Sequence, residues 1–184
     1  MGRTELQKLL EQKKMTKKQI LGHFWPQEKN TKNDSALLVI LAPKNDSAQK
    51  QILTEMLNGL MVLPMHSLVI SDEASPIDVK DTKIAWCSAT KSQLEKYLLA
   101  ADLGLTFEEH QTLIQDFFNK GVVAVGHEKS PLLANYRPNE ETGNSFTFDS
   151  LNPWAIFLAL VRACETFKFP YDWQHIIRGI LKVR

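Results

Sequence analysis

The chain has 184 residues, 43% of them hydrophobic, and its 22 basic and 21 acidic residues leave a formal net charge of +1. This length supports one well-packed soluble domain or one half of a two-domain protein, and the small net charge gives no field that favours nucleic acid or an anionic membrane. No apolar run approaches the roughly 20 residues of a membrane span, so we expect neither nucleic acid nor a membrane as partner.

Residues 1–35 predict a helical lead-in followed by a polar loop. Apolar residues recur at helical spacing over 6–10 and again over 20–24, which predicts two helices, the second ended by Trp25-Pro26. A basic cluster lies between these two apolar groups and is interpreted as the solvated face of a helix. It consists of Lys13, Lys14, Lys17 and Lys18.

Strands and helices alternate over 36–150 and predict a doubly wound α/β core. Apolar segments of strand length occur at 36–42, 67–70, 83–87, 102–106 and 122–125. Asp46 or Ser47 and then Thr90 are suited to begin two of the intervening helices, and Gly121 is suited to end a third. Residues 151–184 predict two closing helices, from about Pro153 and about Tyr171.

The two cysteines do not indicate a disulfide framework or a metal site. Cys87 and Cys164 lie far apart, without C-x-x-C spacing and without paired histidines. Free cysteines fit a reducing compartment such as the cytoplasm. We therefore expect no metal.

A carboxylate follows the fourth predicted strand, directly before a helix, in the segment Phe107-Glu108-Glu109-His110. Parallel sheets carry their chemistry at the carboxyl ends of the strands, beside helix N-termini that attract phosphate. The sequence therefore indicates a candidate nucleotide-binding edge. The plain alternative is that Glu108 or Glu109 is a first-turn acid that interacts favourably with the helix dipole.

Several segments occur in an order and spacing that point to a family: KYLLAADLGL, FEEHQTLIQDFFNKGVVAV, YRPNEETGNSFTFDSLNPWAIFLALVRACETF and a closing YDW. Together they resemble the C-terminal half of glycogen and starch synthases, which are retaining glycosyltransferases of the two-Rossmann (GT-B) type. The resemblance runs from about Glu5 to Arg184. It implies a single Rossmann-like domain over 1–184: a doubly wound parallel sheet, one half of a GT-B fold, with helical N- and C-terminal ends.

The resemblance also implies a ligand and residue roles. In this family the half binds the nucleotide sugar, so the expected donor substrate is ADP-glucose or UDP-glucose, without a further cofactor. Glu108, thirteen residues before Gly121, is expected to face the sugar. Lys44 and Lys50 are expected to neutralise the diphosphate, and the backbone amides of 111–113 (Gln111, Thr112 and Leu113) to cradle it. Equally, both lysines fit ordinary solvent-exposed positions.

The chain departs from the family pattern at several positions. Gln111 replaces a small glycine that lets phosphate approach, and the spacing between the two lysines is one residue off. Pro131 lies where the family has a glycine-glycine turn, so that turn is not expected to bind sugar hydroxyls. Asp116 matches a second family acid but equally fits a solvated helix position.

Four further residues are interpreted as structural. Trp154 and Trp173 fit packing positions at helix starts, and Tyr136 before Pro138 fits a loop anchor. A lone histidine at a helix N-terminus, here His110, is also more often structural.

Two functions of different class follow. In the first, the chain is the nucleotide-sugar-binding half of a glucan synthase-like enzyme, inactive without an N-terminal Rossmann domain in the same chain or in another. In the second, it is a degenerate, non-catalytic relative that acts as an interaction or regulatory module. Glu108, the two lysines and the GNSFTF segment favour the first. The expected compartment is the cytoplasm, or the plastid stroma in a plant or alga.

Overall fold

The computed structural model describes residues 3–28, 35–80, 82–107 and 111–182. Within these ranges six strands form one sheet in the order β3-β2-β1-β4-β5-β6, and every pairing is parallel. The chain reverses its direction of winding between β1 and β4, as in a Rossmann-like doubly wound sheet. The predicted α/β fold is confirmed. The strands are β1 (Ala36–Leu41), β2 (Met65–Ile70), β3 (Ile84–Cys87), β4 (Leu103–Leu105), β5 (Val123–His127) and β6 (Ser145–Phe148).

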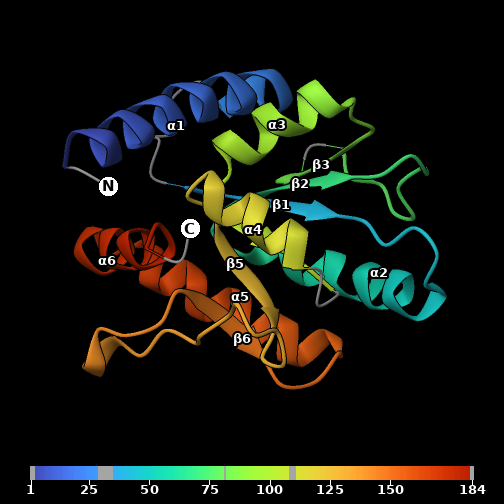
Figure 1. Cartoon of the computed structure of the whole chain (residues 1–184). Helices are drawn as coiled ribbons and strands as arrows, with labels where there is room; N and C mark the ends of the chain where they lie inside the picture. The colour runs from blue at the N-terminus through green and yellow to red at the C-terminus, as the bar shows by residue number, and fades with distance from the viewer. Residues whose placement is uncertain (1–2, 29–34, 81, 108–110, 183–184) are drawn as a thin grey trace.

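Helices cover both faces of the sheet, with α1 and α3 packed together on one face and α2 and α5 on the other (Figure 1). This coverage explains the continuous apolar run of β1, because a strand buried on both faces needs no polar alternation. No helix in the described ranges is long and apolar enough to cross a membrane. The helices are α1 (Arg3–Phe24), α2 (Ser47–Val62), α3 (Lys91–Ala100), α4 (Gln111–Asn119), α5 (Pro153–Phe167) and α6 (Pro170–Ile180), with short 3-10 helices at Pro26–Glu28 and Pro138–Glu140.

The predicted helix boundaries are confirmed where a local cap defines them. The Asp46 side chain accepts hydrogen bonds from the amides of Ala48 and Gln49 and so begins α2. Thr90 and Gln93 form a reciprocal capping box at the start of α3. Gly121 follows α4 with φ +61°, in the left-handed region that favours glycine.

Two predictions about elements are wrong. The lead-in is one helix of 22 residues, α1, because nothing between the two apolar groups interrupts the backbone hydrogen bonds. Residues 145–148 of the GNSFTF segment, left out of the predicted strands, form the edge strand β6, where Ser145 pairs with Ala124 of β5. A four-residue edge strand carries little periodicity of its own and depends on its neighbour for hydrogen bonds.

The interpretation of the basic cluster as a solvated face is wrong for two of its four lysines. Lys13 is 6% exposed, and its ammonium group donates to the carbonyls of Ala101 (2.5 Å) and Lys120 (3.1 Å), close to the ends of α3 and α4. Lys17 is 5% exposed, and its Nζ atom lies 2.5 Å from Oδ2 of the buried Asp102. The two lysines therefore fasten α1 to the α/β core.

Burial of Lys13 makes stability depend on pH. Desolvation lowers the pKa of Lys13 from 10.5 to about 8. The negative charge of Asp102 partly opposes this lowering, whereas the positive charges of Lys17 and Lys120 add to it. At pH values between these two pKa values, Lys13 holds a proton in the unfolded chain that it has released in the native state. The contribution of Lys13 to the free energy of unfolding therefore rises with pH in this range. We expect the free energy of unfolding of the native chain, relative to Lys13→Met, to increase by about 3 kcal/mol from pH 8 to pH 10.5. Denaturant unfolding of both proteins at several pH values measures this difference, and parallel pH curves would contradict it.

Candidate functional site

A groove runs along the carboxyl ends of the first four strands. It consists of three adjoining hollows of about 380, 240 and 400 Å³, the first between the ends of β1 and β4, the second between those of β1 and β2, and the third between those of β2 and β3. The first two share residues 42–45, and the second and third share 71–73. The first hollow lies at the point where the strand order reverses, which is where open α/β sheets bind ligands.

The hollow at the strand reversal contains a buried acceptor. Its walls include Lys44 after β1, Phe107 after β4 and Leu113 in the first turn of α4. Gln49, from the first turn of α2, also lines it and is 7% exposed. The Oε1 atom of Gln49 has no hydrogen-bond partner within the described part of the chain. A buried unpaired acceptor costs about 1–3 kcal/mol, which a ligand that donates a hydrogen bond would offset.

Both predicted lysines lie at this edge of the sheet, and each already contacts a carboxylate. The Nζ atom of Lys44 lies 3.0 Å from Oδ2 of Asp72, and that of Lys50 lies 2.6 Å from Oε1 of Glu73. Asp72 and Glu73 lie two and three residues after the end of β2 and were not among the residues predicted from the sequence. The available signal was their place shortly after a predicted strand, at the same edge as Lys44.

The predicted catalytic residue Glu108 lies outside the described residues, as do Glu109 and His110. Phe107, which precedes this segment, is buried in the wall of the first hollow. On the other side of the segment, Gln111 and Thr112 are exposed at the start of α4, whereas Leu113 is half-buried in the same wall. The roles assigned to Glu108 and to the amides of 111–113 stay predictions.

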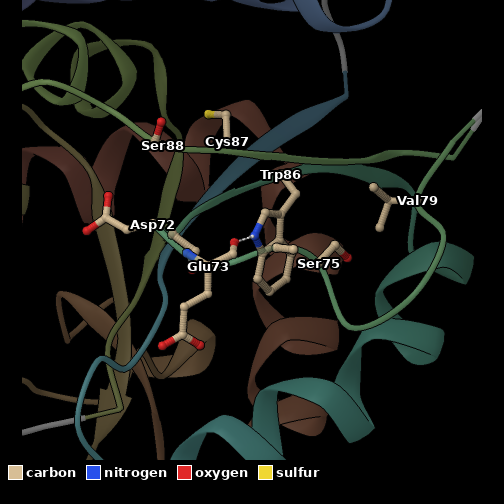
Figure 2. A pocket seen from close by; sticks show the side chains of 9 residues that line it. Asp72, Glu73, Ser75, Val79, Trp86, Cys87 and Ser88 are labelled. Atoms are coloured by element: carbon tan, nitrogen blue, oxygen red, sulfur yellow. Dashed lines mark hydrogen bonds between the residues drawn. The ribbon is translucent and has the colours of Figure 1, made fainter.

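The third hollow presents an aromatic side chain beside carboxylates. Its wall includes the half-buried indole of Trp86, whose Nε1 donates to the carbonyl of Glu73 at 2.8 Å (Figure 2). The Glu73 amide in turn donates to Oγ of Ser71 at 3.0 Å. Burial raises the pKa of the Cys87 thiol in the same wall, which keeps it a weak nucleophile.

The turn after β5 is closed to a ligand through its amides. The amide of Lys129 donates to Nδ1 of His127 at 3.2 Å, and the amide of Ser130 donates to the His127 carbonyl at 3.0 Å. Pro131 itself has no amide hydrogen. The expectation that this turn does not bind sugar hydroxyls stays a prediction.

The remaining candidate residues divide into packing and exposed positions. Tyr136 is confirmed as a loop anchor, because its buried hydroxyl donates to Asp172 of α6 at 2.8 Å. Trp173 packs against Phe167 as predicted, but Trp154 is 79% exposed, so its predicted packing role is wrong. The apolar face of α5 that contacts the sheet begins two residues after Trp154. Asp116 is exposed.

In the described ranges no group of three or more histidine, cysteine, aspartate or glutamate side chains could hold a metal ion.

No protein-family model and no curated protein matches the sequence. Among solved structures, the catalytic domain of starch synthase IV from Arabidopsis thaliana, bound to ADP and acarbose, superimposes with a TM-score of 0.73. The identity is 12%, and the match covers 92% of this chain and 38% of that one. This chain has the fold of one half of a GT-B glycosyltransferase.

Two further structures resemble this GT-B half. The glycosyltransferase of kitacinnamycin matches with a TM-score of 0.51 and 12% identity over 84% of this chain and 40% of that one. The calicheamicin glycosyltransferase CalG4 matches with a TM-score of 0.50 and 15% identity over 83% of this chain and 40% of that one. The chain thus spans about two fifths of the length of each structure that it resembles.

Proposed function

We propose that this chain binds a nucleotide sugar, ADP-glucose or UDP-glucose, as the donor half of a glucan synthase-like glycosyltransferase. The observation that carries the proposal is the hollow at the strand reversal, which lies between the Lys44 loop and the first turn of α4. A cation and a helix N-terminus that face one hollow are suited to a diphosphate. The starch synthase structure with this fold contains ADP.

The groove accommodates the parts of such a ligand in a definite order. The diphosphate binds at Lys44 and Lys50, which supply positive charge, and at the amides of 111–113, which supply N–H donors. Glu108 faces the sugar, where a carboxylate stabilises developing positive charge or accepts from a hydroxyl. The buried oxygen of Gln49 provides a further acceptor for a donor group of the ligand.

Sugar transfer needs a second Rossmann domain, in the same chain or in another. A GT-B enzyme reacts in the cleft between its two halves, and this chain corresponds to about 40% of such proteins. We therefore expect it to bind the donor weakly and not to transfer the sugar by itself.

Titration of the chain with ADP, UDP and their glucose conjugates tests the proposal. Lys50→Ala should weaken all four ligands about tenfold, because a charge-assisted contact to phosphate is lost. Glu108→Ala should weaken only the additional affinity that glucose confers. NMR shift changes or calorimetry measure both effects.

Lys168→Ala provides a matched control, because Lys168 is an exposed lysine paired with Glu165 at 2.7 Å, far along the chain from the groove. It should leave binding unchanged. Equal losses in Lys50→Ala and Glu108→Ala for every ligand would overturn the assigned roles.

One set of observations favours the second candidate, a degenerate interaction module. Lys44 and Lys50 are each neutralised by a neighbouring carboxylate, and the amides of the turn after β5 are already used. An intact fold that shows no binding at millimolar ligand would support this candidate instead.

A further inference from the structure

We propose that Asp72 and Glu73 are specificity-determining residues that act as internal counter-ions to the diphosphate-binding lysines and must be displaced when the ligand binds. This inference rests on the proposed function. It concerns the carboxylates that follow β2, to which neither the sequence analysis nor the proposed ligand contacts assign a role.

The register of the sheet brings the four charged residues together. Leu41 at the end of β1 pairs with Ile70 at the end of β2, and the amide of Ala42 extends the ladder by donating to the Ile70 carbonyl at 3.0 Å. The two loops therefore leave the sheet side by side. Lys44 lies three residues beyond Leu41, and Asp72 lies two residues beyond Ile70, so their contact follows from the strand pairing.

The carboxylates project from an anchored backbone. Ser71 donates its amide to the Cys87 carbonyl at 2.9 Å, which ties the segment to the end of β3. Glu73 is held at both backbone polar groups, through its amide by Ser71 Oγ and through its carbonyl by the Trp86 indole (Figure 2). Because this backbone is anchored, carboxylates that lose their lysine partners to a ligand stay at the groove.

The pairing cancels the charge of the groove. Two lysines and two carboxylates sum to zero, so these four side chains together offer a diphosphate no net positive charge. A bound diphosphate must take the lysines from Asp72 and Glu73, and the released carboxylates then repel it. Both ion pairs are solvent-exposed, and Lys50 is the most covered of the four side chains at 36% exposure. The free-energy cost of breaking these pairs is therefore small.

The consequence is a preference that depends on ligand charge. A nucleoside carries no phosphate and gains nothing from the lysines, so the carboxylates leave its binding unchanged. A nucleoside diphosphate competes directly with them. Affinity for ADP or UDP should therefore rise when the carboxylates are replaced by their neutral amides.

The test compares the native chain with Asp72→Asn, Glu73→Gln and the double variant, titrated with ADP, UDP, adenosine and uridine. Each single variant should bind the diphosphates about threefold more tightly and the double variant about tenfold, as the coupling energies of exposed pairs allow. Nucleoside binding should not change. In a Lys50→Ala background, Glu73→Gln should give a smaller gain than in the native chain, because the competition for Lys50 is gone and only the repulsion between Glu73 and the diphosphate is relieved.

Glu165→Gln is the control, since it removes one exposed carboxylate from the ion pair with Lys168 and changes the net charge equally. An equal gain in this control, or unchanged diphosphate affinity in the double variant while the native chain binds, would overturn the inference and leave the proposed function standing. Binding by the double variant but not by the native chain supports both. Absence of binding by every protein, with the fold intact, overturns both.

Discussion

Replacement of Asp102 by asparagine is expected to lower the free energy of unfolding by about 3–5 kcal/mol, because it leaves the charge of Lys17 buried without a counter-ion. The Oδ2 atom of Asp102 accepts from Lys17 and from the backbone amide of Leu37 in β1 at 2.9 Å. Both side chains of the pair are largely buried, with 7% and 12% exposure, so water does not screen the remaining charge. Denaturant unfolding monitored by circular dichroism measures the loss.

A double-mutant cycle separates the charge effect from simple loss of packing. Asparagine retains an oxygen that accepts from Leu37, so Asp102→Asn changes mainly the charge. Adding Lys17→Met should restore most of the lost stability, since an apolar side chain of similar length replaces the buried cation. Glu165→Gln, which breaks an exposed pair, should cost less than about 1 kcal/mol. Additive losses from Asp102→Asn and Lys17→Met would contradict the expectation.

The elements that could be predicted from the sequence are those with local causes. Asp46 and Thr90 begin helices through bonds to amides two or three residues away, and Gly121 ends one through its own backbone conformation. Such interactions involve residues that are close in the chain, so a local sequence pattern can predict them. The apolar run of β1 is equally direct, because both faces of a central parallel strand are covered.

The wrong interpretation of the basic cluster concerns residues whose partners are distant in the chain. Lys13 and Lys17 fall at helical spacing among other lysines, and nothing local distinguishes them from Lys14 and Lys18. Their burial follows from carbonyls and a carboxylate that lie more than 80 residues away along the chain. Long lysine side chains can cover apolar surface while their charged ends reach polar groups, so polarity alone does not predict exposure.

The candidate site was predicted as an edge but not as a charge arrangement. Lys44 follows a predicted strand, and parallel strands end together, so its place at the groove could be inferred. The contact of Lys44 with Asp72 could not be inferred, although Asp72 also follows a predicted strand, because the adjacency of β1 and β2 is a property of the strand order. Lys50, in the first turn of α2, likewise meets Glu73 from the loop after β2. Glu108 stays a prediction, since the described residues end at Phe107 and resume at Gln111.

A second large effect is expected at Gly104, in the middle of β4, where α4 rests on the sheet. A Cβ atom at this position would lie 2.5 to 2.8 Å from atoms of the Phe117 ring. Phe117 is fully buried, so the ring has no room to withdraw. We expect Gly104→Ala to lower the free energy of unfolding by about 2–3 kcal/mol through overpacking. Thermal or denaturant unfolding tests this directly.

The same substitution should also affect the groove. Phe117 seats α4 on β4, and the first turn of α4 carries Leu113 in the wall of the hollow at the strand reversal. Pushing the ring away from β4 shifts that turn, so diphosphate affinity should fall with stability, and Gly104→Ala/Phe117→Leu should recover both. Gly22→Ala is the matched control: its Cβ meets nothing within 4 Å in α1, so it should raise stability by up to about 1 kcal/mol. If Gly104→Ala changed neither stability nor diphosphate affinity, the close contact between α4 and β4 would not position the wall of the groove.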